Sequence, residues 1–383
     1  MKTRTSGAAV AVCAVVVAAA ALAAEPAKRE GKATGDNLWI DPRVSDLPGL
    51  PQGPFVRLPD GSVLAAESPN SALVSTDEGR SWQKRGILFR DAQKYALRPE
   101  RALLCTRGGT VILAFTNDKE RANWKWDPVL SDSPGARAPT CVVRSTDGGK
   151  TWEEPQKLHD DWTGAIRDIL QTRTGTVVFT SMKMQHGPGR HSVLTYSSTD
   201  EGRTWRPSNV IDCGGIGHHA GVTEATIEEL RDGRLWMLMR TNWRTFWEAF
   251  SRDEGRTWRE VGPTKIDASS APGILGRLAS GRLVLVWNRF YPEGQNSFPL
   301  SGGDRQWSEV PVSNHRLELS IMFSEDEGKT WTQPAVFARS ARGWLAYPHL
   351  FEAQPGELWI TTMQGGLRVR LRERDFFQPA KQL

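Results

Sequence analysis

The sequence predicts an all-β protein built as a six-bladed β-propeller. Five copies of one turn pattern, Ser-x-Asp-x-Gly-x-Ser/Thr-Trp, place their aspartates at positions 77, 147, 200, 253 and 326, at intervals of 53 to 73 residues. A second turn, a glycine that leads into an apolar strand, occurs six times, at Gly61, Gly109, Gly175, Gly233, Gly281 and Gly356. Turns that recur at such intervals between short β-rich runs, without a long helical pattern, are typical of four-stranded propeller blades.

Each position of the first turn pattern has a physical role. The aspartate can accept hydrogen bonds from turn amides, the glycine can adopt a positive φ, and the Ser and Thr hydroxyls can close the loop. The tryptophan can bury its ring against the strand behind it. We therefore expect these turns to be structural, and we assign them no part in chemistry.

The N-terminal segment has the layout of a secretory signal peptide. Two basic residues, Lys2 and Arg4, precede an apolar run over residues 8–22, and small residues follow. We predict a signal peptide over residues 1–24 and export to the periplasm or the extracellular space. The run is too short and too rich in alanine to favour a retained membrane span. Residues 25–36 are polar, and we expect a flexible leader there.

Residues 37–383 are predicted to form the propeller as one domain. The last blade begins near Tyr347, which leaves too few residues for four strands. We expect a strand at about residues 37–40 to complete this blade and close the ring, so that no sheet edge stays exposed. The largest irregular insert, residues 117–139, carries Trp124 and Trp126. It is either a surface loop or a rim above the axial pocket, where tryptophan could stack on a sugar.

Charge and cysteine content exclude several classes of function. The formal net charge of +5 becomes +3 without Lys2 and Arg4, and no basic block occurs, so we expect no nucleic-acid partner. The odd number of cysteines after the signal peptide excludes a complete disulfide framework, although one pair is possible among Cys105, Cys141 and Cys213. None of these cysteines has the paired spacing of a zinc site, and we expect neither metal nor cofactor.

The repeated turn is the Asp box, and with six blades the chain resembles the sialidase (neuraminidase) superfamily of bacterial neuraminidase-repeat propellers over about residues 39–369. The resemblance implies a secreted, exo-acting glycoside hydrolase that releases a terminal acidic sugar, such as sialic acid, from a glycan or glycoconjugate. In that family three arginines bind the sugar carboxylate, a tyrosine assisted by a glutamate attacks the anomeric carbon, and an aspartate is the acid/base. A phenol avoids the repulsion that an anionic nucleophile would meet beside the carboxylate.

The second half of the chain matches the family's active-site segments. Glu224 and Tyr347 resemble the assisting glutamate and the nucleophile, and Arg240 and Arg316 resemble two of the three arginines. Independently of the family, Glu224 and Tyr347 each lie nine residues before the hairpin glycine of their blade. This equal offset predicts that both lie at the same end of inner strands, at the axial funnel. We therefore expect them within hydrogen-bond distance of each other, or one water apart.

The first half departs from the family pattern. Residues 51–55 lack the expected Arg-Ile-Pro segment, and the loop that would carry the acid/base aspartate is missing after Ala66. Arg57 lies too close to its turn to replace the absent arginine. The nine-residue offset supplies other candidates for the funnel mouth. These are Arg101 and Arg167 for the third guanidinium, and Asp168, Glu100 or His219 for the proton donor, with His219 also a candidate for binding substrate hydroxyls.

Three functions therefore remain open on the sequence. The first is a sialidase, the second is a hydrolase or lyase that acts on another acidic sugar, and the third is a carbohydrate-binding propeller without activity. The fold alone does not separate them. Three guanidiniums that converge on one carboxylate would favour the sialidase, and two would favour a related acidic-sugar enzyme.

Overall fold

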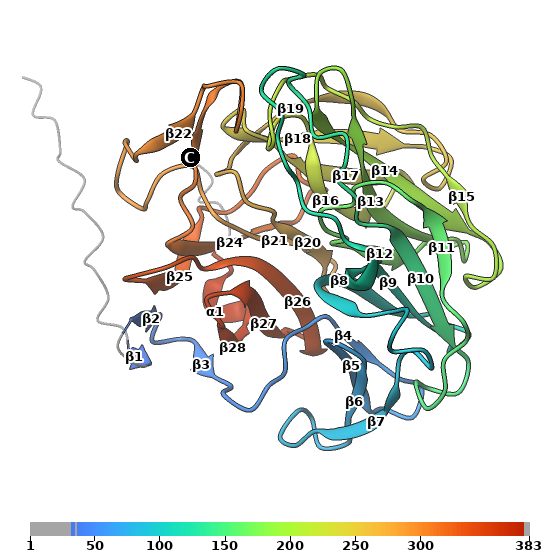
Figure 1. Ribbon diagram of the computed structural model, residues 1–383. Coiled ribbons are helices and arrows are strands. Elements are labelled where there is room, and N and C mark those ends of the chain that lie inside the picture. The colour runs from blue at the N-terminus through green and yellow to red at the C-terminus, as the bar shows by residue number, and fades with distance from the viewer. Residues whose placement is uncertain (1–31, 35–36, 379–383) are drawn as a thin grey trace, which may run out of the picture.

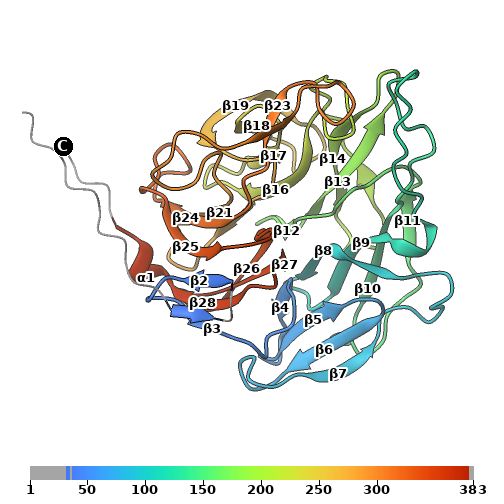
Figure 2. The same ribbon diagram turned by 60° about the vertical axis from the view of Figure 1, so that its left-hand side comes forward.

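The computed structural model describes residues 32–34 and 37–378, and it confirms the predicted six-bladed β-propeller. Six antiparallel blades, five of four strands and one extended to six, follow one another around a central axis, from blue to red along the chain (Figures 1 and 2). The predicted signal peptide lies outside the described residues. The helical elements of the described part are a 3-10 turn, η1 (Asp118–Glu120), and one short helix, α1 (Glu373–Phe376). None of its helices is long and apolar enough to cross a membrane.

The first three blades are regular. Blade 1 consists of β4 (Phe55–Arg57), β5 (Val63–Glu67), β6 (Ser71–Ser75) and β7 (Gln83–Ile87). Blade 2 consists of β8 (Leu97–Cys105), β9 (Val111–Asn117), β10 (Thr140–Ser145) and β11 (Gln156–His159). Blade 3 consists of β12 (Ile169–Gln171), β13 (Val177–Gln185), β14 (Arg190–Ser198) and β15 (Arg206–Pro207).

The next two blades carry the residues that matter for the site. Blade 4 consists of β16 (Thr223–Glu229), β17 (Leu235–Arg240), β18 (Thr245–Ser251) and β19 (Arg259–Asp267). Blade 5 consists of β20 (Ile274–Arg277), β21 (Leu283–Trp287), β24 (Glu318–Ser324) and β25 (Ala335–Ser340). A separate hairpin, β22 (Leu300–Gly302) and β23 (Pro311–Ser313), is inserted between β21 and β24. From β4 to β26, the first strand of each blade contacts that of the next, so these strands line the axis.

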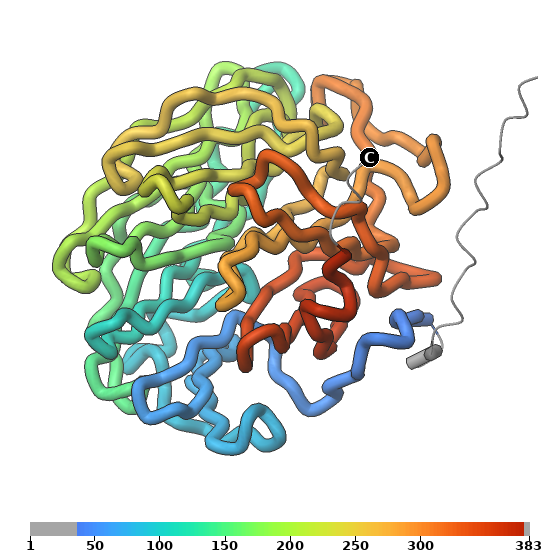
Figure 3. Tube along the Cα trace, turned by 180° about the vertical axis from the view of Figure 1, so that it is seen from behind, coloured from blue at the N-terminus to red at the C-terminus, as the bar shows by residue number. Residues whose placement is uncertain are grey.

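An N-terminal strand closes the ring, but it is not the strand that we expected. Blade 6 consists of β26 (Ala346–Gln354), β27 (Glu357–Gln364), β28 (Arg368–Arg372) and β3 (Ser45–Asp46). Figure 3 shows the blue N-terminal segment beside this red blade. The expected strand at residues 37–40 is instead β2 (Leu38–Ile40), which extends blade 5 by pairing with β25. The reason is apolar packing, since Ile40 is 2% exposed in a core cluster with Phe337 and Ala338.

A short strand lies within the predicted leader. Lys32–Thr34 forms β1, which pairs with β2 and adds a further strand to the outside of blade 5. The rest of residues 25–36 lies outside the described residues.

The five Asp boxes have the predicted geometry. In the third box Asp200 accepts the backbone N–H of Thr204 at 2.9 Å and its hydroxyl at 2.6 Å, while the N–H of Gly202 donates to Ser198 at 2.8 Å. Gly202 has a φ of +80°. The indole of Trp205 donates to the carbonyl of Gly202 at 3.1 Å. These bonds lie within the turn, which supports a structural role.

The core lies between neighbouring blades. One apolar cluster joins blades 1 and 2, and similar clusters occupy the other interfaces. At the closing interface Phe55 of blade 1 meets the edge of Trp359 of blade 6, with ring centroids 5.7 Å apart. A Cβ on Gly79 would lie 2.5 Å from this tryptophan, so only glycine allows the close approach. Packing between blades thus holds the inner strands in place around the axis.

Candidate active site

A cavity of about 530 Å³ lies at the end of the axis bordered by blades 4, 5 and 6 and by the inserted hairpin. It is lined by His219, Arg240, Ser301, Gly302, Trp307, Asn314, Arg316, Trp344, Tyr347 and Gln364. Four residues that we proposed from the sequence are thus brought together, namely Tyr347, Arg240, Arg316 and His219. None of the lining residues is a carboxylate.

Tyr347 and Glu224 form the hydrogen-bonded pair that the sequence predicted. The hydroxyl of Tyr347 donates to Glu224 Oε1 at 2.8 Å, although the residues lie 123 positions apart in the chain. Both residues are 8% exposed, so the bond is formed in a largely water-excluded place. The expected distance between them is confirmed, and a carboxylate is placed to accept the phenol proton.

The backbone is strained at both members of this pair. Glu224 has a φ of +45° and Tyr347 a φ of +61°, values that side-chain-bearing residues rarely adopt. Each stands at the start of an inner strand, and at Glu224 the pairing of β16 with β17 shifts register between Thr223 and Thr226. Such strain costs on the order of 1–3 kcal/mol and is concentrated at functional sites. The local backbone therefore supports a functional assignment for the pair.

Arg240, at the end of β17, joins the pair to the wall of the cavity. Its Nη1 donates to Glu224 Oε2 at 2.5 Å and lies 3.4 Å from the Tyr347 hydroxyl. Its Nη2 donates to the Ser270 hydroxyl at 2.8 Å, and Ser270 in turn donates to Asn242 at 2.7 Å. This chain of bonds fixes the guanidinium plane. The sequence analysis missed Ser270 and Asn242 because neither belongs to a motif.

Arg316 supplies the second guanidinium of the cavity. Its Nη2 donates to the Ser270 carbonyl at 2.5 Å, and its Nη1 donates to Gln364 at 3.1 Å. The guanidinium carbon lies 4.5 Å from the ring centroid of Trp344, which is 50% exposed. Arg240 and Arg316 together outweigh the single negative charge of Glu224, so the cavity favours an anionic ligand.

The pKa values of the pair follow from burial and from these arginines. Burial acts to raise the pKa of Glu224, but the charge and hydrogen bond of Arg240 more than offset it, so this pKa is lowered. Burial and the charge of Glu224 raise the pKa of Tyr347 to about 12. At neutral pH the pair therefore consists of a phenol and a carboxylate, the protonation states that a nucleophile and its base require.

The inserted hairpin of blade 5 forms one wall of the cavity. The backbone N–H groups of His218 and His219 donate to the carbonyls of Gln306 and Trp307, each at 2.8 Å. Asn242 bonds both His219 and Ser308 of the hairpin, at 2.7 and 3.0 Å. The sequence signal for this wall was the interval of 73 residues between the last two Asp boxes, which exceeds a plain blade.

Residues 117–139 border this wall without entering the cavity. Trp124 packs edge-on against His218 with centroids 4.6 Å apart, and the ring contacts continue through His219 to Trp307. Trp126 lies 6.3 Å from Trp124 in a stacked arrangement. Neither tryptophan of the insert is among the cavity-lining residues. The insert therefore packs against the outer side of the residues that form this wall of the cavity.

Asp168 does not line the cavity, which corrects its expected place at the funnel mouth. Its carboxylate accepts bonds from the Thr226 hydroxyl and from the backbone N–H of Ile227, and so ties blade 3 to blade 4. Burial raises the pKa of Asp168 to about 6. Glu100 pairs with Arg98 at 3.4 Å and is also absent from the lining.

Arg101 and Arg167 are likewise outside the cavity, so no third guanidinium lines it among the described residues. Both are 2% exposed. Arg101 donates to the carbonyls of Ala66 and Pro99 and so links blades 1 and 2. Arg167 donates to the carbonyl of Pro348 at 2.6 Å, directly after Tyr347. The nine-residue offset correctly predicted that both residues lie near the axis. It did not predict that their side chains are buried between blades and do not reach the cavity.

His219 lines the cavity as a neutral imidazole. Burial lowers its pKa, and the charge of Arg240 lowers it further. Its ring lies 4.9 Å from that of Trp307. A neutral imidazole can accept a hydrogen bond from a sugar hydroxyl or donate one to it. It does not act as the general acid that protonates a leaving group.

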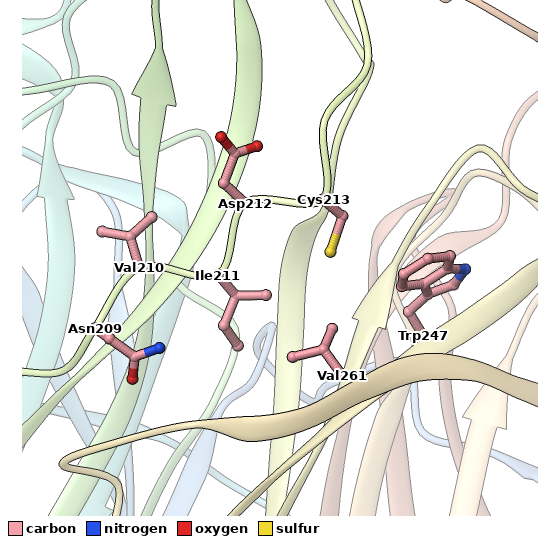
Figure 4. A pocket seen from close by; sticks show the side chains of 7 residues that line it. All are labelled: Asn209, Val210, Ile211, Asp212, Cys213, Trp247 and Val261. Atoms are coloured by element: carbon pink, nitrogen blue, oxygen red, sulfur yellow. The ribbon is translucent and has the colours of Figure 1, made fainter.

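A second cavity, of about 340 Å³, lies between blades 3 and 4 and lacks such chemistry. Figure 4 shows the side chains that line it, among them Ile211, Cys213, Val261 and Trp247, with the carboxylate of Asp212 turned away from them. Asp212 is paired with Arg190. Within residues 37–378 Cys105, Cys141 and Cys213 are free thiols, so the possible disulfide is not formed. In the same part of the chain no three His, Cys, Asp or Glu side chains gather as metal ligands.

Comparisons with known proteins agree with this architecture. Residues 70–360 match the family described as BNR repeat-like domain. A sialidase of Paraclostridium sordellii is 24% identical over 281 residues, which cover 66% of this chain and 66% of that protein. A sialidase of Bacteroides fragilis is 26% identical over 279 residues, which cover 67% of this chain and 47% of that protein.

The chain thus spans about half to two thirds of the length of these relatives. Among solved structures, the Hadza microbial sialidase Hz136 superposes with a TM-score of 0.58 at 18% sequence identity, over 84% of this chain and 65% of that one. This likeness shows a shared fold. With five Asp boxes, six blades and a family match across most of its length, the chain belongs to the BNR repeat-like family of the sialidase superfamily.

Proposed function

We propose that the protein is a sialidase-like glycoside hydrolase that removes a terminal acidic sugar, with sialic acid as the first candidate. One observation carries the proposal: the 2.8 Å hydrogen bond between Tyr347 and Glu224, formed where Arg240 and Arg316 line the same cavity. The sialidase names of the curated relatives support the same class. In this proposal Tyr347 is the nucleophile, Glu224 its base, and the two arginines hold the sugar carboxylate.

The proposed reaction proceeds in two displacements. Tyr347 Oη attacks the anomeric carbon while its proton passes to Glu224, and the bond from that carbon to the leaving-group oxygen breaks. Water then attacks the same carbon, the bond to Oη breaks, and Glu224 returns the proton to Oη. The proton that water loses neutralises the departed leaving group through solvent. The sum is hydrolysis, with Tyr347 and Glu224 restored.

Among the described residues, the cavity offers no evident proton donor for the leaving group. No carboxylate lines the cavity, the Asp168 carboxylate bonds blade 4, and His219 is neutral. A leaving group that departs as an anion without protonation is therefore the best first substrate. Aryl glycosides have this property.

A second candidate is a hydrolase or lyase for another acidic sugar, such as a uronide. The specific observation in its favour is that two guanidiniums line the cavity, where a sialidase of the family pattern would have three. The Tyr347–Glu224 pair speaks against the third possibility, a propeller that only binds carbohydrate, because binding does not require a strained, buried phenol–carboxylate pair.

The test compares purified wild-type protein with the Tyr347→Phe variant. Each protein is assayed with an aryl α-sialoside and with an aryl uronide. Release of sialic acid that is lost in Tyr347→Phe supports the first proposal. Turnover of the uronide alone identifies the second candidate. No turnover of either substrate, together with measurable binding of the free acidic sugar, would point to the binding propeller and overturn both enzymatic proposals.

A further inference from the structure

Arg167 is a buried cation that reaches from blade 3 to blade 6 directly beside Tyr347. It precedes β12, and its Nη2 donates to the carbonyl of Pro348 at 2.6 Å. Its guanidinium carbon lies 5.3 Å from the centroid of the Tyr347 ring, within the range of a cation–π contact. One side chain therefore touches both the ring of Tyr347 and the peptide that follows it.

Arg167 is buried at an unusual cost. It is 2% exposed, and neither its Nε nor its Nη1 has a hydrogen-bond partner among the described residues. No ion pair is recorded for it in this part of the chain. Arg101, equally buried, has more partners, because its Nη1 and Nη2 both bond backbone carbonyls of blades 1 and 2 and only its Nε lacks a partner among the described residues. A buried guanidinium with so few hydrogen-bond partners destabilises the fold unless nearby negative groups interact with its charge.

Both members of the proposed catalytic pair interact with that guanidinium. Burial lowers the pKa of Arg167, and the charge of Glu224 is the largest influence that opposes this shift. Arg167 also contacts the backbone at a strained point, since Tyr347 has a φ of +61° and is followed by proline. Residues before proline are themselves restricted, so the conformation of Tyr347 depends on its surroundings to hold it.

We propose that Arg167 is a positioning residue for Tyr347: it holds the ring and the following peptide so that Oη faces Glu224, and its positive charge stabilises the negative charge that Oη acquires during the reaction. The inference rests on the proposed function. In the first displacement Oη gives up its proton to Glu224, and in the second it leaves the anomeric carbon with the bonding electrons. Arg167 exchanges no atom in either step.

The placement of Arg167 predicts a distinctive kinetic effect. Because Arg167 does not line the cavity, it does not contact the sugar, and its loss should lower kcat and leave KM nearly unchanged. For Arg167→Met we expect kcat on the aryl glycoside to fall about tenfold or more, with KM within about threefold of wild type. Arg167→Lys keeps the charge and should recover part of kcat.

Arg101→Met is the matched control. It removes an equally buried arginine from the neighbouring inner strand, without any contact to Tyr347. Its thermal midpoint should fall like that of Arg167→Met, because both variants lose a buried cation and its backbone bonds. Its kcat should stay within about threefold of wild type. An equal loss of kcat in both variants would mean that burial, and not contact with Tyr347, explains the effect.

A second measurement needs no glycoside. A tyrosine-selective sulfonyl fluoride labels phenols in proportion to their nucleophilicity, and peptide mass spectrometry gives the rate at each tyrosine. We expect Tyr347 to be labelled several-fold more slowly in Arg167→Met than in wild type, while Tyr291, which bonds Arg244 and does not line the cavity, is labelled equally in both. If wild type cleaves no glycoside, the proposed function fails, and this rate still decides the role of Arg167.

Two further results would overturn the inference. One is an unchanged rate of Tyr347 labelling in folded Arg167→Met and in Arg167→Lys. The other is a raised KM at constant kcat, which would make Arg167 a residue that binds substrate.

Discussion

The hydroxyl of Tyr347 in blade 6 donates a 2.8 Å hydrogen bond to Glu224 in blade 4, and both residues have a positive φ at the start of an inner strand. The two residues meet beside the first strand of blade 5, β20, which contacts both β16 and β26. Blade 6 is completed by β3, whose Ser45 and Asp46 pair with β28. Loss of β3 would therefore be expected to weaken blade 6 and to disturb the position of Tyr347, although β3 lies outside the site.

The first prediction concerns the members of this pair. Tyr347→Phe should abolish turnover of the aryl glycoside, because phenylalanine offers no oxygen to the anomeric carbon. Glu224→Gln should lower kcat by about 10²- to 10⁴-fold, the usual worth of a general base. Steady-state kinetics measure both effects, and the thermal midpoint checks that the fold remains. Turnover in Tyr347→Phe at the wild-type rate would remove the nucleophile assignment.

The second prediction is the pH dependence of kcat/KM. Glu224 acts as a carboxylate, and its pKa is lowered below 4.5, so activity should persist into the acidic range and fall only as the pH drops through that lowered pKa. Tyr347, with a pKa of about 12, stays protonated throughout the neutral range. A flat profile from about pH 5 to pH 8 is expected.

A variant of Arg240 checks the cause of the acidic limb. Arg240 opposes the effect of burial on Glu224, so Arg240→Gln should raise the pKa of Glu224 and move the acidic limb to higher pH. Only the pH at the midpoint of the limb is read, so a lower overall activity in the variant does not affect the comparison. An acidic limb that stays in place would show that another group controls it.

Most of the fold could be predicted because its signals are local. Each Asp box forms its bonds within one turn, so the pattern alone specifies the structure. The strand that completes blade 6 could not be predicted in the same way. Residues 38–40 and 45–46 are both short, and only the burial of Ile40 against blade 5 decides which of them joins which sheet.

The candidate site was predictable to a similar extent. Equal offsets from hairpin glycines placed Glu224 and Tyr347 together because strand register carries over from blade to blade. The same offset could not tell that Asp168 turns to blade 4, since that depends on the hydroxyl of Thr226. Trp307 was missed because it lies in an insert whose fold follows from contacts with His219 and Asn242, not from a repeat.

The third prediction concerns stability at low pH. Hydrogen bonds from the side chain and backbone of Ser81, and from Ser75, lower the pKa of Asp77 to about 2. A carboxyl with a lowered folded-state pKa contributes stability above its unfolded pKa near 3.8, and this contribution is lost as the pH falls toward 2. The thermal midpoint should therefore drop between pH 4 and pH 2.

Asp77→Asn provides the comparison for this effect. Asparagine keeps one acceptor oxygen but does not titrate, so the variant should be less stable than wild type at pH 7 and should lose less stability on acidification. Asp46, on the closing strand and outside any box, supplies the control Asp46→Asn. If Asp77→Asn and wild type show the same dependence on pH, the box carboxylate is not the group responsible.

The fourth prediction tests whether Arg316 holds a carboxylate. Its guanidinium is fixed by the Ser270 carbonyl, Gln364 and the ring of Trp344, so its N–H groups are already oriented for a planar anion. Arg316→Lys keeps the charge and loses this forked geometry. The expected loss of binding is about 1.5–3 kcal/mol for the acidic sugar, the range of a charge-assisted hydrogen bond. Arg252→Lys, at an exposed ion pair with Glu260, is the control and should bind as wild type does.

The methyl ester of the same sugar separates the carboxylate from the rest of the ligand. In wild type the ester should bind much more weakly than the acid, because it has lost the charge that the guanidinium recognises. In Arg316→Lys the difference in binding free energy between acid and ester should shrink by roughly the 1.5–3 kcal/mol that the variant loses on the acid. Titration calorimetry on the four combinations gives this coupling energy directly. A coupling near zero would mean that Arg316 supports Trp344 and the cavity wall, and that the carboxylate is bound elsewhere.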